Sequence, residues 1–139
     1  MGEHILLLIL ILACAVGEDL YAYRISNVWI AAGLITGLIR QILCNGYMGV
    51  KESIAGMIVP VLILFPVFLC RGIGAGDIKL LSVVGSYLSY HASFSILAAS
   101  VLLGGIYAMI QILRGKRSEK LHMSIPIMLS TVIWLEGII

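Results

Sequence analysis

Long apolar stretches separated by short polar segments are the main pattern along this chain. Uncharged or nearly uncharged runs cover residues 5–16, 28–43, 53–70, 80–113 and 125–139. A helix that crosses a bilayer needs about 20 residues. The 34 residues of the fourth run would form a helix of about 51 Å, which is longer than one crossing requires. We expect this run to split near residues 89–93, so the pattern predicts six transmembrane helices.

The composition supports a membrane protein. Apolar residue types make up 61% of the 139 residues and charged types only 12%, whereas a soluble domain has about 25% charged residues. Water would not solvate such a surface, which excludes a soluble enzyme, a disordered tail, a nucleic-acid binder and a disulfide scaffold. We therefore expect an all-α integral membrane protein, a polytopic bundle of six helices that forms one membrane-embedded domain over residues 1–139.

The three cysteines indicate neither metal nor redox chemistry. Cys14, Cys44 and Cys70 are widely spaced, and each lies in apolar sequence. Because they form no closely spaced pair, a zinc site or a paired redox motif is not expected. Buried, unreactive thiols are the simplest interpretation. We expect neither a metal ion nor a cofactor.

Positive charge is concentrated on one side of the predicted membrane. If six crossings alternate in direction, seven of the nine basic residues fall on one side: Arg24, Arg71, Lys79, Arg114, Lys116, Arg117 and Lys120. The other side receives only Arg40 and Lys51. The positive-inside rule then makes the first side cytoplasmic and places both termini outside. The first helix is expected to be retained, because Glu3 and His4 precede it, whereas a signal peptide begins with basic residues.

Two acidic residues stand out, because ionisable groups near membrane depth are costly and are often functional. The other five have simple explanations as residues near the termini, in loops or beside Asp19: Glu3, Glu136, Glu52 in the outer loop, Glu119 in the basic inner loop, and Glu18 as a solvated neighbour. Asp19 ends the first predicted helix and Asp77 begins the fourth. Two crossings separate them, so both return to the cytoplasmic edge, where their carboxylates can meet.

A pair of close carboxylates can hydrolyse an amide. The two cannot easily ionise together, so one keeps a proton that the other has lost. The ionised member takes a proton from water, while the protonated member polarises the carbonyl and later helps the leaving amine. Gly74 and Gly76 remove side chains where a substrate backbone would approach, and they permit unusual backbone angles. Lys79 is near enough in sequence to lower the pKa of a carboxylate or to bind a lipid phosphate.

Structural and non-catalytic interpretations are also compatible with these residues. Asp77 would then only cap the fourth helix, since carboxylates favour helix N-termini, and Asp19 would be an interfacial acid balanced by Arg24. A non-catalytic membrane protein is the alternative function: an ion pathway, a transporter half or an assembly partner, with the aspartates as relay or structural groups.

Two other features receive a structural interpretation. Gly33 and Gly37 form a GxxxG pattern, which allows close helix packing and is expected to act within the molecule. His91 and His122 lie at the ends of predicted helices, and both are expected to be solvated.

Two motifs in this chain resemble those of the prepilin peptidases. Residues 74–79, Gly-Ala-Gly-Asp-Ile-Lys, are similar to the GxGD motif of that family, in which an apolar residue and Lys follow the Asp. Residues 19–27 are similar to the first motif, in which an Asp after the first helix precedes a basic residue, here Arg24, and an Ile-Pro-Asn turn that ends here at Asn27. Ser26 stands where the family usually has proline, so a stiffening residue is lost from the turn.

The resemblance implies an intramembrane aspartic endopeptidase of the GxGD type. Asp19 and Asp77 correspond to the two catalytic aspartates, and five further residues would shape or support the site: Gly74, Gly76, Lys79, Arg24 and Asn27. Such an enzyme removes a short basic leader from a prepilin or pseudopilin, after a glycine, at the cytoplasmic face of the inner membrane.

The resemblance also bears on methylation and on partners. Larger bacterial members methylate the new N-terminus and carry a cytoplasmic segment with paired cysteines. Those pairs are absent here, so we expect cleavage without methylation, as in the short peptidases of tight-adherence (Flp) pilus systems. Archaeal preflagellin peptidases share the same core and stay an alternative. The basic loop at residues 114–120 is expected to contact anionic membrane lipid.

Overall fold

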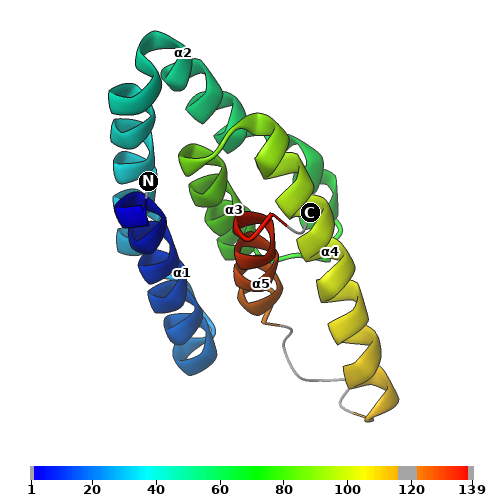
Figure 1. The fold of residues 1–139 in the computed structure, drawn as a ribbon. Coiled ribbons are helices and arrows are strands. Elements are labelled where there is room, and N and C mark those ends of the chain that lie inside the picture. Colours follow the sequence, from blue (N-terminus) through cyan, green and yellow to red (C-terminus); the bar gives the residue numbers. More distant parts are fainter. Residues whose placement is uncertain (1, 116–121, 138–139) are drawn as a thin grey trace.

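The protein is a bundle of helices that run between two ends of the molecule (Figure 1). The computed structural model describes residues 2–115 and 122–137, and within them there are helices but no strand. The helices are α1 (Gly2–Ala22), α2 (Asn27–Leu69), α3 (Ala75–Tyr87), α4 (Tyr90–Leu113) and α5 (Ser124–Leu135). By length and apolar composition, α1, α2 and α4 are each able to cross a membrane. The expected class, an all-α membrane protein, is confirmed.

Helix α2 consists of two helical arms that meet at Gly46. This glycine has φ 57° and ψ −136°, which lies outside the helical region and favours a residue without a side chain. The chain changes direction there, and the two arms diverge from that point (Figure 1). The predicted outer loop between the second and third apolar stretches is therefore wrong. Lys51 and Glu52 are helical, because one glycine in this conformation redirects the chain without a loop.

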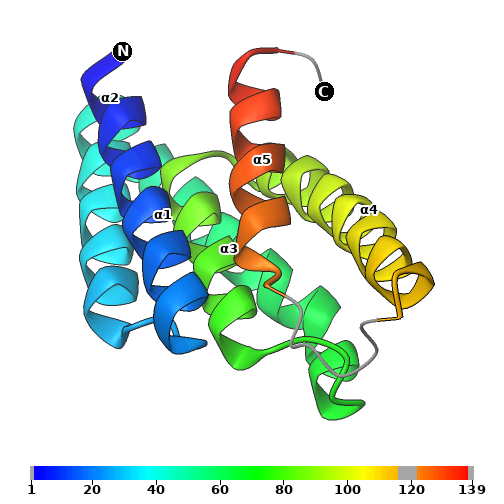
Figure 2. The same cartoon turned by 90° about the horizontal axis from the view of Figure 1, so that it is seen from below.

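Helix α3 is the central element of the bundle (Figure 2). It contacts all four other helices, and its contact with α2 is the most extensive. All residues from 80 to 88 are buried. With 13 residues, α3 is about 20 Å long, so it is shorter than the helices around it. The other helices therefore enclose most of α3, while its first turn, which carries Asp77, is only partly buried.

Small residues allow the backbones of α2 and α3 to touch. A Cβ atom added at Gly56 would lie 2.2 Å from the carbonyl oxygen of Gly85. The hydroxyl of Ser53 donates a hydrogen bond of 3.0 Å to the carbonyl of Ser86. On the other arm of α2, added Cβ atoms at Gly33 and Gly37 would meet the side chains of Val83 and Ser86, respectively. The prediction that the GxxxG pattern serves packing within the molecule is confirmed.

The basic residues that the structure describes are divided between the two ends of the bundle. Both ends of the described chain lie toward one end, together with the Gly46 bend (Figure 1). The opposite end carries the α1–α2 link, the α2–α3 link, the end of α4 and the start of α5. Three of the basic residues grouped by the sequence lie in or beside these segments: Arg24, Arg71 and Arg114. A fourth, Lys79, lies in α3 close to the start of that helix. Lys116, Arg117, Glu119 and Lys120 lie outside the described residues.

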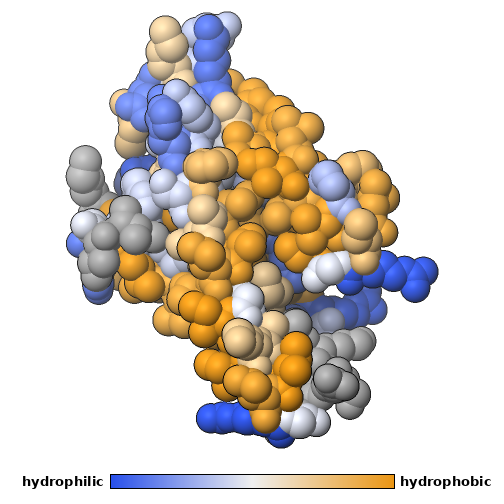
Figure 3. All heavy atoms as spheres, turned by 90° about the vertical axis from the view of Figure 1, so that its right-hand side faces the viewer, coloured by the Kyte–Doolittle hydropathy of each residue, from blue (hydrophilic) through white to orange (hydrophobic). Residues whose placement is uncertain are grey.

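Apolar side chains cover much of the outer surface of the bundle (Figure 3). Leu102 on α4 and Leu62 on α2, for example, are 68% and 69% exposed. Cys44 and Cys70 are also exposed, and only Cys14 is partly buried. The expectation of buried thiols is therefore wrong for two of the three. In a membrane protein, apolar sequence faces lipid as readily as it faces the core.

Candidate active site

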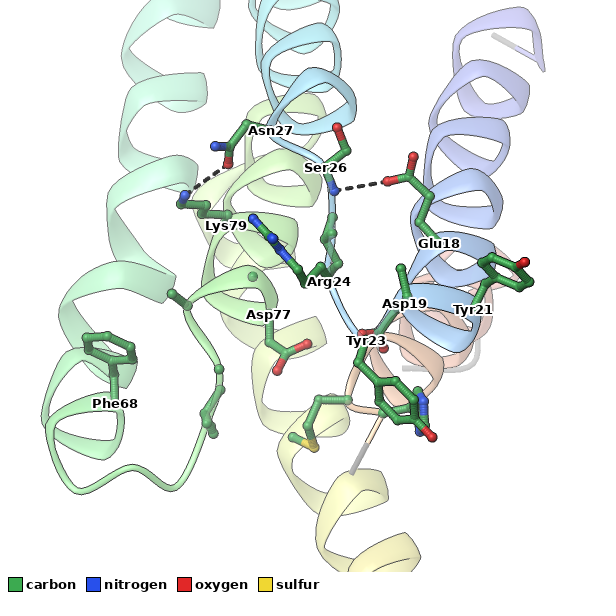
Figure 4. Close-up of a pocket in the computed structure, with 18 of the residues that line it drawn as sticks. Glu18, Asp19, Tyr21, Tyr23, Arg24, Ser26, Asn27, Phe68, Asp77 and Lys79 are labelled. Atoms are coloured by element: carbon green, nitrogen blue, oxygen red, sulfur yellow. Dashed lines mark hydrogen bonds between the residues drawn. The ribbon is translucent and has the colours of Figure 1, made fainter. Parts of the chain in front are cut away.

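An open pocket of about 1750 Å³ lies at the end of the bundle where α1 ends and α3 begins. The α1–α2 link, the α2–α3 link and the segment that leads into α5 all line it (Figure 4). Asp19 and Asp77, which are 58 residues apart in the sequence, both line this pocket. The chain topology thus brings the two predicted aspartates to one place.

Asp19 lies in the last turn of α1. The helix ends at Ala22, and the next residue, Tyr23, has a φ of 53°, the left-handed conformation typical of a helix C-terminus. The Tyr23 backbone N–H donates a hydrogen bond of 2.9 Å to the Asp19 carbonyl, which closes this last turn. The Asp19 carboxylate accepts a hydrogen bond of 2.5 Å from the hydroxyl of Ser124, the first residue of α5. Asp19 is therefore held by a helix that begins 105 residues later.

Asp77 lies in the first turn of α3, outside the three long apolar helices. Its backbone N–H donates to the Gly74 carbonyl at 3.2 Å, and its carboxylate accepts a hydrogen bond from the Gly74 backbone. The helix-capping contact that the structural interpretation expected is thus present. Capping alone would lower the pKa of Asp77. Burial and the charge of Asp19 outweigh it and raise the pKa to about 6.

Ser26, at the position of the usual proline, keeps the backbone conformation of a proline. Its φ is −65° and its ψ is 135°, and it serves as the N-cap of α2. The Ser26 backbone N–H, which proline lacks, donates a hydrogen bond of 2.9 Å to the Glu18 carboxylate (Figure 4). The same carboxylate accepts a 2.9 Å hydrogen bond from the indole of Trp29. The hydrogen bond from Ser26 to Glu18 therefore restrains the turn that a proline ring would otherwise stiffen.

Lys79 and Asn27 connect the two motifs directly. The Lys79 ammonium donates a hydrogen bond of 3.1 Å to the Asn27 side-chain oxygen, which joins the first turns of α3 and α2 (Figure 4). Arg24 also lines the pocket, but its guanidinium extends toward Lys79 rather than toward Asp19 (Figure 4). Figure 4 therefore gives no support to the structural interpretation that Arg24 balances Asp19.

Gly74 and Gly76 provide space rather than unusual backbone angles. Gly74 has φ −75° and ψ 149°, which any residue adopts, and neither glycine has a positive φ. An added Cβ at Gly74 would lie 3.1 Å from an Asp77 carboxylate oxygen, and one at Gly76 would lie 3.4 Å from Ile25. The expectation of unusual angles is wrong. The two glycines keep side chains away from the Asp77 carboxylate and allow the two motifs to pack closely.

Three further residues at this site were missed or misjudged in the sequence. Glu18 is not simply solvated, because it holds Ser26 and Trp29. His122 is also not solvated: its Nε2 atom is buried without a hydrogen-bond partner in the described part of the chain, and its ring lies 4.8 Å from the Tyr23 ring. Nothing in the sequence indicated a role for Ser124, because a serine in an apolar stretch is common. Of the three, only Glu18 could have been assigned to the site from the sequence, because it directly precedes Asp19.

Comparison with known proteins agrees with this site. A model of the type IV leader peptidase family matches residues 5–109, which include both aspartates and the glycines before Asp77. Searches among curated proteins and among solved structures gave no match. The match covers about three quarters of the chain and leaves α5 outside it. On this match, together with the two motifs at one pocket, the chain belongs to the type IV leader peptidase family.

Proposed function

We propose that this protein is an intramembrane aspartic endopeptidase of the GxGD type. It removes the short basic leader of a prepilin or pseudopilin, after a glycine, at the cytoplasmic face of the cell membrane. One observation carries this proposal: Asp19 and Asp77 line the same open pocket, at the end of the bundle that also receives Arg24, Arg71, Lys79 and Arg114. The pocket belongs to a chain of the leader peptidase family.

The proposed reaction needs only the two carboxyl groups and one water molecule. One carboxylate removes a proton from water, and the water oxygen attacks the carbonyl carbon of the scissile peptide. The other carboxyl group donates a hydrogen bond to the carbonyl oxygen, on which negative charge develops. The C–N bond then breaks, and the amine leaves with the proton that the water lost. The raised pKa of Asp77, about 6, supports a shared proton between the two groups.

An apolar groove beside the pocket supports a substrate with an apolar helix. The groove has a volume of about 330 Å³, and its lining comes from both arms of α2 and from α3: Ile30, Leu34, Met57, Ile58, Val61, Ile78, Lys79 and Ser82. Lys79 lines both the groove and the aspartate pocket, so the two lie next to each other. A pilin precursor has an apolar helix directly after its basic leader. We propose that this helix lies in the groove while the scissile bond reaches the aspartates.

We also propose the orientation of the bundle in the membrane. The pocket end faces the cytoplasm, in agreement with the positive-inside rule, and both termini lie outside. Counting the two arms of α2 separately, six helical segments of the described chain alternate in direction between the two ends of the bundle, with Asp19 and Asp77 at the inner boundary of the membrane. Because the sequence has no paired cysteines, the proposed product keeps an unmethylated N-terminus, as in Flp pilus systems.

Co-expression with a tagged precursor tests this function. The precursor carries a basic leader ending in glycine, followed by an apolar helix, and the processed band is measured by immunoblot. Asp19→Asn and Asp77→Asn are each expected to lower cleavage about 10²- to 10⁴-fold, the usual contribution of general acid–base catalysis. Glu136→Gln, an exposed acid at the end of α5, is the matched control and should cleave normally. Mass spectrometry of the product should find a free, unmethylated amine.

The outcomes separate the competing interpretations. Normal processing by either asparagine variant would remove that aspartate from the catalytic pair. If the wild-type protein, present in the membrane fraction, processes no such precursor, the peptidase proposal is wrong and an ion pathway or assembly role is favoured. A methylated product would overturn only the proposal about methylation.

A further inference from the structure

The hydrogen bond between Ser124 and Asp19 is a polar contact that the two family motifs do not include. Ser124 is completely buried, and its hydroxyl lies 2.5 Å from Oδ2 of Asp19. It belongs to α5, which lies outside the residues matched by the family model. Within the described chain, this is the hydrogen bond that reaches the carboxylate of Asp19 from another helix.

The packing of α5 fixes the position of this hydroxyl. Ser124, Ile127 and Thr131 lie on one face of α5, and each is at most 1% exposed. At the start of the helix, Met123 packs so closely on Gly104 of α4 that an added Cβ there would lie 2.7 Å from the Met123 side chain. The start of α5 is therefore held between α1 and α4, and Ser124 is directed at Asp19.

We propose that Ser124 is a positioning residue that holds Asp19 as the ionised, water-activating member of the aspartate pair, which leaves the proton on Asp77. This inference rests on the proposed peptidase function. It goes beyond that function because it assigns a separate chemical role to each carboxyl group. It also gives α5 a part in the chemistry.

Three observations support this division of roles. A hydroxyl that donates to a carboxylate stabilises its ionised form, and 2.5 Å is within the range of such charge-assisted O–H···O⁻ bonds. Ser124 is the first residue of α5, so the positive end of the helix dipole is close to the same carboxylate. Asp77, in contrast, is buried beside the charge of Asp19, and its pKa is raised to about 6.

Other titratable and charged groups share the pocket with Asp19. They come from α1, from both links, from α3 and from the segment before α5: Glu18, Tyr21, Tyr23, Arg24, Arg71, Asp77, Lys79 and His122. Glu18 is engaged by Ser26 and Trp29, and Lys79 by Asn27. None of these contacts involves Ser124, so a shift in the pH profile is expected to report on the lost hydroxyl.

The test compares Ser124→Ala with Ser130→Ala in the full-length protein, using purified enzyme and the tagged precursor. Ser130 is a matched control, since it is also completely buried on α5 but donates to the Ile127 carbonyl. Ser124→Ala should lower kcat roughly 10- to 100-fold, the value of a hydrogen bond to a charged group, with KM unchanged. The acidic limb of its pH profile should move to higher pH, because the ionised member of the aspartate pair loses a donor. Ser130→Ala should match the wild type in both respects.

Each result decides a separate point. Wild-type cleavage of the precursor is the positive control, and its absence would contradict the peptidase function rather than the role of Ser124. If the wild type cleaves and Ser124→Ala keeps the wild-type kcat and pH profile, the proposed role is wrong. If Ser124→Ala loses activity without moving the acidic limb, Ser124 has only a structural role and the assignment of Asp19 is overturned. Thermal unfolding in detergent identifies any variant that is simply unfolded.

Discussion

At the scale of single residues, the two aspartates are similar groups in different surroundings. Asp19 accepts a hydrogen bond from a buried hydroxyl, whereas Asp77 is desolvated beside a negative charge. Glu18 shows the same dependence on surroundings, since its carboxylate holds a backbone N–H that a proline would not have. The chemistry proposed for each acid thus follows from its neighbours rather than from its residue type.

The raised pKa of Asp77 predicts a pH-dependent gain in stability for Asp77→Asn. The folded protein binds this proton more tightly than the unfolded chain, since the pKa rises from 3.8 to about 6. Its stabilising effect is complete below the unfolded pKa and is lost as the pH rises through about 6. The neutral asparagine avoids this loss. The variant should therefore be more stable than the wild type by up to about 3 kcal/mol at neutral pH.

Thermal unfolding in detergent micelles, at about pH 4 and about pH 7.5, checks this prediction. The gain over the wild type should be clearly larger at the higher pH. Glu136→Gln, at an exposed position, should show no such difference. An equal gain for Asp77→Asn at both pH values would mean that the burial of a charged carboxylate is not its cause.

At the scale of helices, α3 carries Asp77 and is positioned by backbone contacts with α2. The carbonyl oxygen of each of Gly56 and Gly85 lies within 2.2 Å of where a Cβ on the other residue would be. From α4, the hydroxyl of Ser93 donates to the Gly56 carbonyl at 3.0 Å. At the same end of α3 as Gly85, the side chain of Gln41 on α2 donates to the carbonyls of Tyr87 and Leu88, both at 3.2 Å. These contacts fix the position of α3 along the length of α2, and therefore the position of Asp77 in the pocket.

Gly56→Ala should separate α2 from α3. The added methyl group would lie 2.2 Å from the Gly85 carbonyl oxygen, and overpacking of this kind costs about 1–3 kcal/mol. Gly105→Ala is the control, because nothing lies within 4 Å of its added Cβ and alanine is favoured in a helix by about 1 kcal/mol. Thermal unfolding should show a lower midpoint for the first variant only. Equal midpoints would mean that the close contact does not support the fold.

At the scale of the whole molecule, the two ends of the bundle carry different groups, and the proposed function places the chemistry at only one of them. At the pocket end, Arg24, Arg71 and Lys79 line the pocket with the two aspartates, while the opposite end carries the Gly46 bend and the termini (Figure 1). An active site at one end fits a substrate whose apolar helix enters the membrane while its charged leader stays in water. The side on which this end lies decides which precursors it can meet.

Two natural cysteines allow a direct test of orientation. Cys44 lies beside the Gly46 bend and Cys70 at the end of α2 near the pocket, and both are exposed. We prepare two single-cysteine proteins, one with Cys14→Ala and Cys70→Ala, the other with Cys14→Ala and Cys44→Ala. In intact spheroplasts, a membrane-impermeant maleimide should label Cys44 and not Cys70, and inside-out vesicles should give the reverse. Labelling of Cys70 from outside would invert the proposed orientation.

The membrane class, the apolar helices and the order of the two aspartate motifs follow from the sequence alone. The length of an apolar run and the direction of the chain are local properties, so they do not depend on how the helices pack. The loop predicted around Glu52 was wrong, since a single glycine at Gly46 redirects the helix. The partners of Glu18, His122 and Ser124 depend on which helices pack together, and apolar sequence looks the same whether it faces lipid or a neighbouring helix. A serine 105 residues away therefore reaches Asp19 only through the packing of α5 against α1 and α4.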